Sequence, residues 1–254
     1  TAQTRVQSGF GPLLDGIHRV AANDREALEK LFEQRGTSLC GMIVELIQGE
    51  AGIHPLDPGF VKLARDLCTE HNVLLIIDEI QTGFGRTGKL FCYEHSGILP
   101  DAMTLAKALA NGLPMGALIV AEGHETLLSG GMHGSTFGGN HLVARVAYET
   151  LRIIMGRELL AHAAALSEYF FRRLRLLQAE RPDLIADVRG LGLHIGVELK
   201  RPGKDIVNVC LSQGLVLNCT AEKVLRIMPP LNMSLENADV GLSILERVIK
   251  DQSA

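Results

Sequence analysis

A strand–helix–strand pattern in the first third of the chain constrains the fold more than any other feature of the sequence. Residues 42–47 form a short run that is apolar apart from Glu45 and rich in β-branched side chains, which predicts a buried strand. Asp57-Pro58 is typical of a helix start, and apolar residues then recur at helical spacing to about His71. Residues 73–77 form an uninterrupted apolar run, as in a parallel strand that is covered on both faces. Such a βαβ unit predicts a right-handed crossover and an α/β fold.

The pattern of expected secondary structure changes after Arg181-Pro182, where short strand-like runs replace longer elements. Further strands are expected at 116–121, 185–188, 194–199, 215–218 and 224–228, and further helices at about 140–155, 157–180, 204–212 and 235–250. Ser234 is the expected N-cap of the last helix. We therefore expect an α/β layer followed by a small α+β domain, with the boundary between about residues 155 and 182.

Composition and charge argue against several other kinds of protein. With 46% hydrophobic residues and a net charge of -4, the chain has the apolar content of a folded domain and not of a disordered segment. The acidic balance, 4% aromatic residues and the absence of Trp argue against nucleic acid as a partner. No apolar run is long enough to span a membrane and the first residues lack a signal core, so we expect no membrane partner.

The five cysteines are odd in number and form no C-x-x-C pair; they are Cys40, Cys68, Cys92, Cys210 and Cys219. This spacing suggests neither a disulfide framework nor a zinc ribbon, and we expect no metal site. Small buried thiols in a reducing cytoplasm are the simplest interpretation.

Residues 83–88 match the G-x-G-x-x-G letters of a dinucleotide-binding loop, but their context does not fit. The preceding strand ends at Asp78, several residues before the first glycine, and Gly97 and Pro100 prevent a long helix from following. We expect instead that these glycines let a loop pass close to a ligand or a neighbouring subunit.

Two ionisable residues stand out against apolar surroundings. Asp78 follows the strand at 73–77 directly, and ligands of open α/β sheets bind at that edge. A carboxylate that caps the next segment is the alternative. Lys107 is the only charged residue in the stretch 102–121. It could extend along apolar surface to reach water, but a desolvated lysine has a lowered pKa and an amine able to form a Schiff base.

Other polar residues could bind anions. The segment 133–140 offers hydroxyls and flexible backbone N–H groups before a helix, which suits a phosphate. Arg226 stands alone in an apolar strand, as a carboxylate clamp or as an exposed edge residue. Glu45 and Glu50 follow the first strand, where a solvated loop is the default interpretation.

Together, a strand-end carboxylate, an isolated lysine, an anion loop and a lone arginine fit a pyridoxal phosphate bound to the lysine. The motifs that match one known family, in order and spacing, are Glu45-Leu-Ile-Gln-Gly-Glu50-Ala-Gly, Asp78-Glu-Ile-Gln81-Thr-Gly-Phe-Gly-Arg-Thr-Gly88, Thr104-Leu-Ala-Lys107-Ala-Leu-Ala-Asn-Gly-Leu-Pro, His133-Gly-Ser-Thr136-Phe-Gly-Gly-Asn140, Val188-Arg-Gly-Leu-Gly-Leu and Leu225-Arg226-Ile-Met-Pro-Pro. With them the chain resembles the class III pyridoxal-phosphate aminotransferases. It corresponds to the C-terminal two-thirds of the family's length.

The resemblance implies a fold type I architecture, in which a mixed, mostly parallel sheet has helices on both faces and a small α+β domain follows. Residues 1–156 would be part of the large domain, and 157–254 the linking helix and the small domain. It also implies that Lys107 binds the cofactor covalently and moves the substrate proton. Asp78 would pair with the pyridine nitrogen, Gln81 with the ring hydroxyl, and Ser135 and Thr136 with the phosphate, Thr136 across a homodimer interface.

For the substrate, the resemblance implies that Arg226 binds a carboxylate, with Glu50 as its partner when that carboxylate is absent and Glu45 nearby. The motifs are most similar to the members that transfer the terminal amino group of acetylornithine to 2-oxoglutarate in arginine biosynthesis. Ornithine or another ω-amine as donor is the alternative. A truncated subunit that only dimerises is a further possibility, because the family's upstream phosphate loop, ring-stacking aromatic residue and second arginine have no counterpart in this sequence. Glu45-Leu46 and Asn140-His141 replace the family's Glu-Pro and Asn-Pro.

Overall fold

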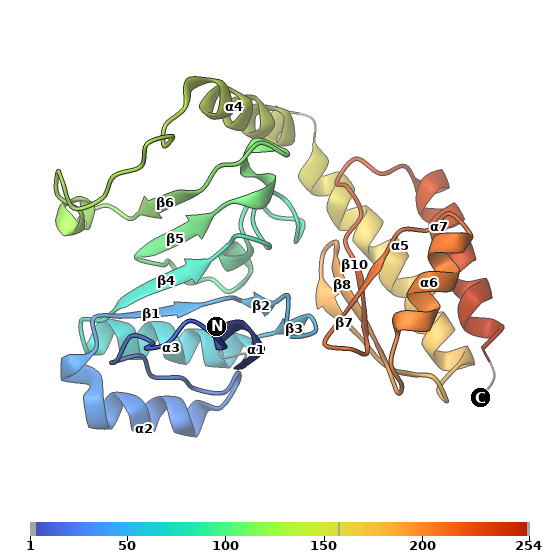
Figure 1. Ribbon diagram of the computed structural model, residues 1–254, viewed down its shortest axis with the longest axis horizontal. Helices are drawn as coiled ribbons and strands as arrows, with labels where there is room; N and C mark the ends of the chain where they lie inside the picture. Colours follow the sequence, from blue (N-terminus) through green and yellow to red (C-terminus); the bar gives the residue numbers. More distant parts are fainter. Residues whose placement is uncertain (1–3, 157, 253–254) are drawn as a thin grey trace.

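The computed structural model describes residues 4–156 and 158–252, which form two bodies that lie side by side (Figure 1). The first body contains a four-stranded sheet in the order β1-β4-β5-β6 and a small β2–β3 hairpin. Its elements are α1 (Thr4–Gln7), α2 (Arg25–Arg35), β1 (Gly41–Val44), β2 (Ile47–Gln48), β3 (His54–Pro55), α3 (Pro58–Glu70), β4 (Leu74–Asp78), β5 (Ala102–Leu105), β6 (Ala117–Val120) and α4 (His141–Gly156).

The βαβ prediction is confirmed, since β1 and β4 pair in parallel and α3 connects them. Asp57 caps α3 by accepting hydrogen bonds from the backbone N–H groups of Gly59 (2.9 Å) and Phe60 (3.2 Å). The apolar side of α3, including Phe60, packs against the buried Leu75 and Ile77 of β4. β5 continues the sheet in parallel, whereas β6 is antiparallel to it.

The predicted strand at 42–47 is wrong in extent. The chain leaves the sheet after Val44, and Ile47 then pairs with Pro55 in the hairpin. β1 is therefore a short edge strand, and its Ile43 is 63% exposed. The strand at 116–121 is confirmed in position as β6, but it is not buried, because it is the other edge of the sheet.

β4 also differs from the expectation that both of its faces are covered. Leu75 and Ile77 are fully buried, whereas Leu74 and Ile76 on the opposite face are only half-buried. Helices cover one face of this strand, and no element in the described part of the chain covers the other as completely. β5 was not predicted as a strand, since its Ala-Met-Thr-Leu sequence has only one β-branched residue.

The second body is a four-stranded antiparallel sheet, ordered β7-β8-β10-β9, against which helices pack. Its elements are α5 (Leu159–Glu180), β7 (Ile185–Leu191), β8 (His194–Leu199), α6 (Lys204–Ser212), β9 (Asn218–Thr220), β10 (Val224–Ile227) and α7 (Leu235–Lys250). The predicted mixture of short strands and helices in this part of the chain is confirmed. Ser234 caps α7 as expected, accepting from Asn237 N at 3.2 Å. β9 starts later than the predicted 215–218, because pairing with β10 sets its extent. Arg157, the expected start of α5, lies outside the described residues.

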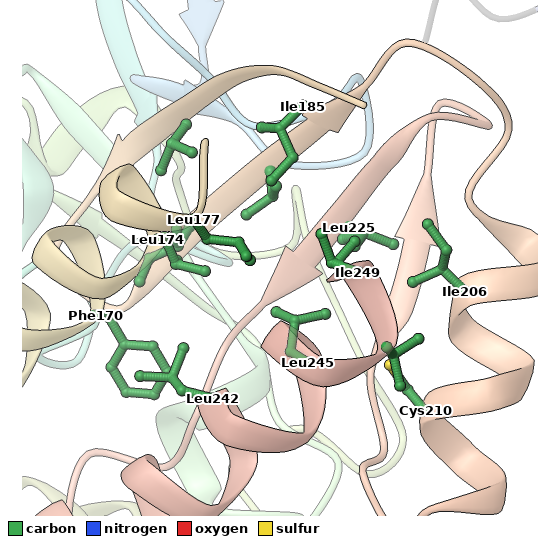
Figure 2. Packing of buried hydrophobic residues seen from close by; sticks show 14 of the residues in the cluster. Phe170, Leu174, Leu177, Ile185, Ile206, Cys210, Leu225, Leu242, Leu245 and Ile249 are labelled. Atoms are coloured by element: carbon green, nitrogen blue, oxygen red, sulfur yellow. The ribbon is translucent and has the colours of Figure 1, made fainter. Parts of the chain in front are cut away.

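The core of the second body lies between α5, α7 and the sheet. Figure 2 shows Phe170 and Leu174 of α5 facing Leu242 of α7, with Leu225 of β10 close to Ile249. Full burial of one such side chain contributes about 1.5–3 kcal/mol, so this cluster holds the small sheet against its helices. Since α5 contributes several residues to this cluster, we propose that it belongs with the second domain, as the division at residue 157 implies.

The glycine motif at 83–88 packs closely against the second body of the same chain, and its expected approach to a ligand or a neighbouring subunit stays a prediction. A Cβ on Gly85 would lie 2.9 Å from the side chains of Leu160 and Leu231. A Cβ on Gly88, which has φ +89°, would lie 3.3 Å from the Cβ of Ala164 of α5. The glycines therefore let the loop pack against α5 and the second body of the same chain. No helix in the described residues is long and apolar enough to cross a membrane.

Candidate active site

The sequence brings three of the predicted site residues to one edge of the main sheet. Asp78 is the last residue of β4 and pairs in register with Thr104 of β5, three residues before Lys107. Glu45 follows Val44, which pairs with Ile77. The carboxyl ends of parallel strands meet at one edge, and this is where ligands of open α/β sheets bind.

Asp78 and Gln81 both have free hydrogen-bonding capacity. Asp78 is half-buried, its carboxylate accepts from Ile80 N at 2.9 Å, and it takes part in no salt bridge within residues 4–156 and 158–252. Gln81 donates from Nε2 to Oε1 of Glu50 at 3.0 Å. Its own Oε1 and the Oγ1 of Thr104 are buried without a hydrogen-bond partner in the described part of the chain. Buried polar atoms without partners are costly, so this edge is suited to a polar ligand.

Lys107 begins a short 3₁₀ turn with φ +44°, in the left-handed region. The side chain is exposed, which differs from the expected desolvation, although Leu109 and Ala110 of the same turn are buried. Partial burial is nevertheless the main cause that lowers the pKa of Lys107 below its usual value. The positive charge of Arg226 adds to this, while Glu50, Glu45 and Asp78 oppose it.

Arg226 and Glu50 form an ion pair, with 2.5 Å between Nη1 and Oε1. Arg226 is 16% exposed and Glu50 61% exposed, so the arginine is fixed and the carboxylate faces solvent. Arg226 Nε also donates to Asn218 Oδ1 at 3.2 Å. The hydrogen bond from Arg226 is the largest cause that lowers the pKa of Glu50, followed by that from Gln81. The role predicted for this pair stays a prediction.

Glu45 is half-buried, and the charges of Asp78, Lys107 and Glu50 act on its carboxylate. It accepts from Gly49 N at 3.2 Å, and burial is the main cause that raises its pKa. The carboxylates of Asp78 and Glu50 raise that pKa further, while Lys107 opposes them. Glu45 therefore helps to hold the backbone of the turn that follows, in addition to any contact with a substrate.

A cavity of about 620 Å³ lies between the two bodies and is lined by residues of both. Its polar lining includes Lys107, Glu50, Gln81, Arg86 and Arg226. Its apolar lining comes from the ends of α4 and α5 and from the segment after β10, namely Ile153, Ile154, Leu159, Met228, Pro230 and Leu231. An amine, a guanidinium and a carboxylate that share one half-apolar cavity can bind a small zwitterion.

Ser135 and Thr136 are not part of this cavity. Both are exposed in the loop between β6 and α4. Asn140 caps α4 as the sequence indicates, accepting from Leu142 N at 3.1 Å and Val143 N at 3.3 Å. The phosphate-binding roles of Ser135 and Thr136, and the contact of Thr136 with a partner subunit, stay predictions.

Several residues near the site were missed in the sequence. Arg86 connects the two bodies, donating to the carbonyl oxygens of Leu193 (3.2 Å) and Pro229 (2.6 Å). His194 is fully buried, and neither ring nitrogen has a partner in the part of the chain that the structure describes. Burial first, and then the charges of Arg86 and Arg226, lower its pKa to about 4. A polar residue inside the apolar run at 193–197 was the available signal for His194.

The residues present fit pyridoxal phosphate. Lys107 offers an amine of lowered pKa. Within the described residues, Asp78 offers a carboxylate that forms no salt bridge, and Gln81 and Thr104 offer polar atoms without hydrogen-bond partners. Fold and site together are those of an open α/β sheet with a ligand-binding edge, at which a lysine and a carboxylate lie close together.

More particularly, the chain belongs to the class-III aminotransferase family, whose profile matches residues 1–249. Members of this family use pyridoxal 5'-phosphate. Acetylornithine aminotransferase of Methanocaldococcus jannaschii is 42% identical over 253 residues, which are 99% of this chain and 62% of that protein. The Aquifex aeolicus enzyme of the same name is 39% identical over 98% of this chain and 63% of its own length.

Solved structures show the same fold. The ornithine aminotransferase of Toxoplasma gondii has a TM-score of 0.93 at 32% identity, covering 98% of this chain and 60% of that one. A second structure of that enzyme was described with partial occupancy of PLP at the active site. Acetylornithine aminotransferase of Elizabethkingia anophelis has a TM-score of 0.89 at 34% identity, covering 96% of this chain and 62% of that one. The chain thus spans about three-fifths of the length of these relatives.

Proposed function

We propose that this chain provides the lysine-bearing part of a transaminase that moves the terminal amino group of N2-acetylornithine to 2-oxoglutarate. The products are N-acetylglutamate 5-semialdehyde and glutamate, a step of arginine biosynthesis. The observation that supports this most is the Arg226–Glu50 ion pair in the same cavity as Lys107. The named relatives at about 40% identity support acetylornithine as the donor. Ornithine is the second candidate, because ornithine aminotransferases are similar in structure.

The cofactor, when bound, supplies an electron sink for the carbon from which a proton is removed. Lys107 Nζ is the group that accepts and returns this proton, and its lowered pKa makes the neutral amine more available at neutral pH. Asp78 would hold a proton on the ring nitrogen of the cofactor, and its carboxylate has no competing salt bridge among the described residues. Gln81 and Thr104 present oxygen atoms that have no partner among residues 4–156 and 158–252 and that can orient polar groups.

Substrate choice depends on Arg226. For 2-oxoglutarate and glutamate, the guanidinium binds a carboxylate with its bidentate fork. For acetylornithine the reacting end is an amine, and an unpaired guanidinium at 16% exposure would be costly. Glu50 neutralises it there, and the exposed position of this carboxylate leaves it room to turn away when a substrate carboxylate arrives.

The functional unit is a homodimer in this proposal, with Ser135 and Thr136 at the cofactor phosphate. The loop that contains them exposes Met132 (66%) and Phe137 (85%), apolar side chains that a partner subunit would cover. The cytoplasm is the proposed compartment, because all five cysteines are free thiols.

The test uses the polypeptide as its gene encodes it, mixed with pyridoxal phosphate and then with one donor at a time. A visible absorbance band of lysine-bound cofactor is expected, followed by its loss with acetylornithine and with glutamate. Faster loss with ornithine than with acetylornithine would favour the second candidate. If no band forms, the proposal is wrong and the interpretation as a non-catalytic subunit stands.

A further inference from the structure

The turn that carries Glu50 belongs to the first body by sequence but is bonded to the second. It connects β2 to β3, and the hydroxyl of Thr220 in β9 donates to the carbonyl oxygen of Glu50 at 2.7 Å. Thr220 is 7% exposed, so water competes little for this bond. Arg189 of β7 donates to two further carbonyl oxygens of the same turn, those of Gly52 (2.6 Å) and Ile53 (2.8 Å).

Packing places the same turn over the strand that bears Arg226. Ile53 is fully buried, and a Cβ on Gly196 of β8 would lie 2.9 Å from the Cβ of Ile53. Gly196 is also the register partner of Arg226 in β10. A Cβ on Gly52 would lie 3.2 Å from the side chain of Val224, two residues before Arg226. The turn is therefore seated on the part of the small sheet that positions the arginine.

The contacts of Glu50 with the first body are of another kind. Gln81 donates to its side-chain carboxylate and not to its backbone, at 3.0 Å. The backbone of Glu50 is thus fixed to the small sheet, while its carboxylate lies between Arg226 and Gln81. A rotation of the Glu50 side chain alone can therefore break or form its bonds to Arg226 and Gln81, while the backbone of the turn stays in place.

We propose that Thr220 is a positioning residue for donor selection: its hydroxyl fixes the backbone of Glu50 to the sheet that carries Arg226. The pair then opens and closes by side-chain rotation, without moving the turn or the two bodies. This inference rests on the proposed function, in which Glu50 neutralises Arg226 for the ω-amine donor. Thr220 tests it better than Arg189, because Arg189 also pairs with Glu198 and Asp187 and its loss would leave them unpaired.

The experiment measures single-turnover rates with acetylornithine and with glutamate in the cofactor-loaded enzyme. Thr220→Val keeps the shape and removes the donor. It is expected to shift the rate ratio roughly two- to tenfold toward glutamate, the range that one net hydrogen bond provides. Thr220→Ser should restore the original ratio. Ser167→Ala is the matched control, since it removes another buried hydroxyl-to-carbonyl bond of the second body, to Gly192 at 2.9 Å; the ratio should not change.

A double variant shows whether Thr220 acts through Glu50. In a Glu50→Ala background, Thr220→Val should shift the ratio no further, because the side chain that it positions is gone. Independently of turnover, amide hydrogen exchange in the turn at 49–53 should be faster in Thr220→Val and unchanged in Thr220→Ser.

The outcomes separate this inference from the proposed function. If Glu50→Ala itself leaves the donor ratio unchanged, the role of the ion pair in the proposed function is wrong. If Glu50→Ala shifts the ratio but Thr220→Val does not, or if the two shifts add in the double variant, the positioning role alone is refuted.

Discussion

Replacing His194 with Leu should make the protein markedly more resistant to mild acid. The imidazole is fully buried at the start of β8, and neither ring nitrogen has a partner among the described residues. Burial first, and then the charges of Arg86, Arg226 and Lys107, lower its pKa from the usual 6.5 to about 4, while the charge of Glu50 opposes this shift. The folded state therefore keeps this ring neutral where the unfolded chain binds a proton.

This difference in protonation determines both the direction and the size of the change in stability with pH. Because the unfolded state binds more protons between pH 6.5 and 4, the free energy of unfolding falls as the pH falls through that window. Between pH 7.5 and pH 5, this one group should remove about 2 kcal/mol of stability. Leu cannot take up a proton, so the His194→Leu variant should not show this loss of unfolding free energy as the pH falls.

Urea unfolding of both proteins at pH 7.5 and pH 5 tests the prediction, with the same cofactor state throughout. The difference in unfolding free energy between variant and parent should grow by about 2 kcal/mol at the lower pH. The exposed His18 replaced by Gln controls for the removal of a histidine as such. An equal difference at both pH values would refute the reasoning and would mean that the ring has a partner that stabilises its charged form.

Three further predictions concern the site. Lys107→Ala should abolish turnover and the cofactor adduct that borohydride traps, because the covalent link and the proton acceptor are lost together; an adduct on another lysine, found by peptide mapping, would reassign the role. Asp78→Asn should keep the circular dichroism spectrum but reduce the single-turnover rate at least tenfold, since a charge-assisted bond contributes about 1.5–3 kcal/mol; a normal rate would exclude the carboxylate from the chemistry. Arg226→Lys should slow the glutamate half-reaction roughly tenfold more than the acetylornithine half-reaction, because a point charge replaces a bidentate fork; equal slowing in stopped-flow measurements would show that Arg226 does not distinguish the substrates.

Local signals in the sequence account for much of the fold and for the sheet-edge residues. The cap at Asp57-Pro58 and the apolar run before Asp78 are short-range features, and both formed the elements they predict. Parallel pairing then places Asp78 near Lys107, since Asp78 pairs with Thr104. No pattern within 42–47 shows that the strand leaves the sheet after Val44, because that depends on pairing with residues 54–55.

Burial was harder to predict than position, and for one physical reason. An apolar strand such as β6 has the same sequence whether it lies at the centre or at the edge of a sheet, and only its neighbours decide how much of it is covered. The glycines at 83–88 are similar: the sequence shows that a close approach is needed, but not that α5 is what approaches.

The ion pair between Glu50 and Arg226 likewise depends on neighbours that only folding provides. The resemblance to a known family predicted this pair, whereas the residues next to Glu50 and Arg226 in the sequence do not predict it. They are separated by 176 residues, and the ion pair requires the β2–β3 turn to lie on a sheet from the other end of the chain. Contacts at this range come from Thr220, Arg189 and Gly196, none of which has an unusual local pattern. In the proposed function, the proton transfer depends on residues at one sheet edge and the choice of donor depends on the second body, so the two properties can change separately. Substitutions at the edge around Asp78 and Lys107 are expected to affect the proton transfer common to all donors, whereas substitutions beneath the Glu50 turn are expected to change which donor is accepted.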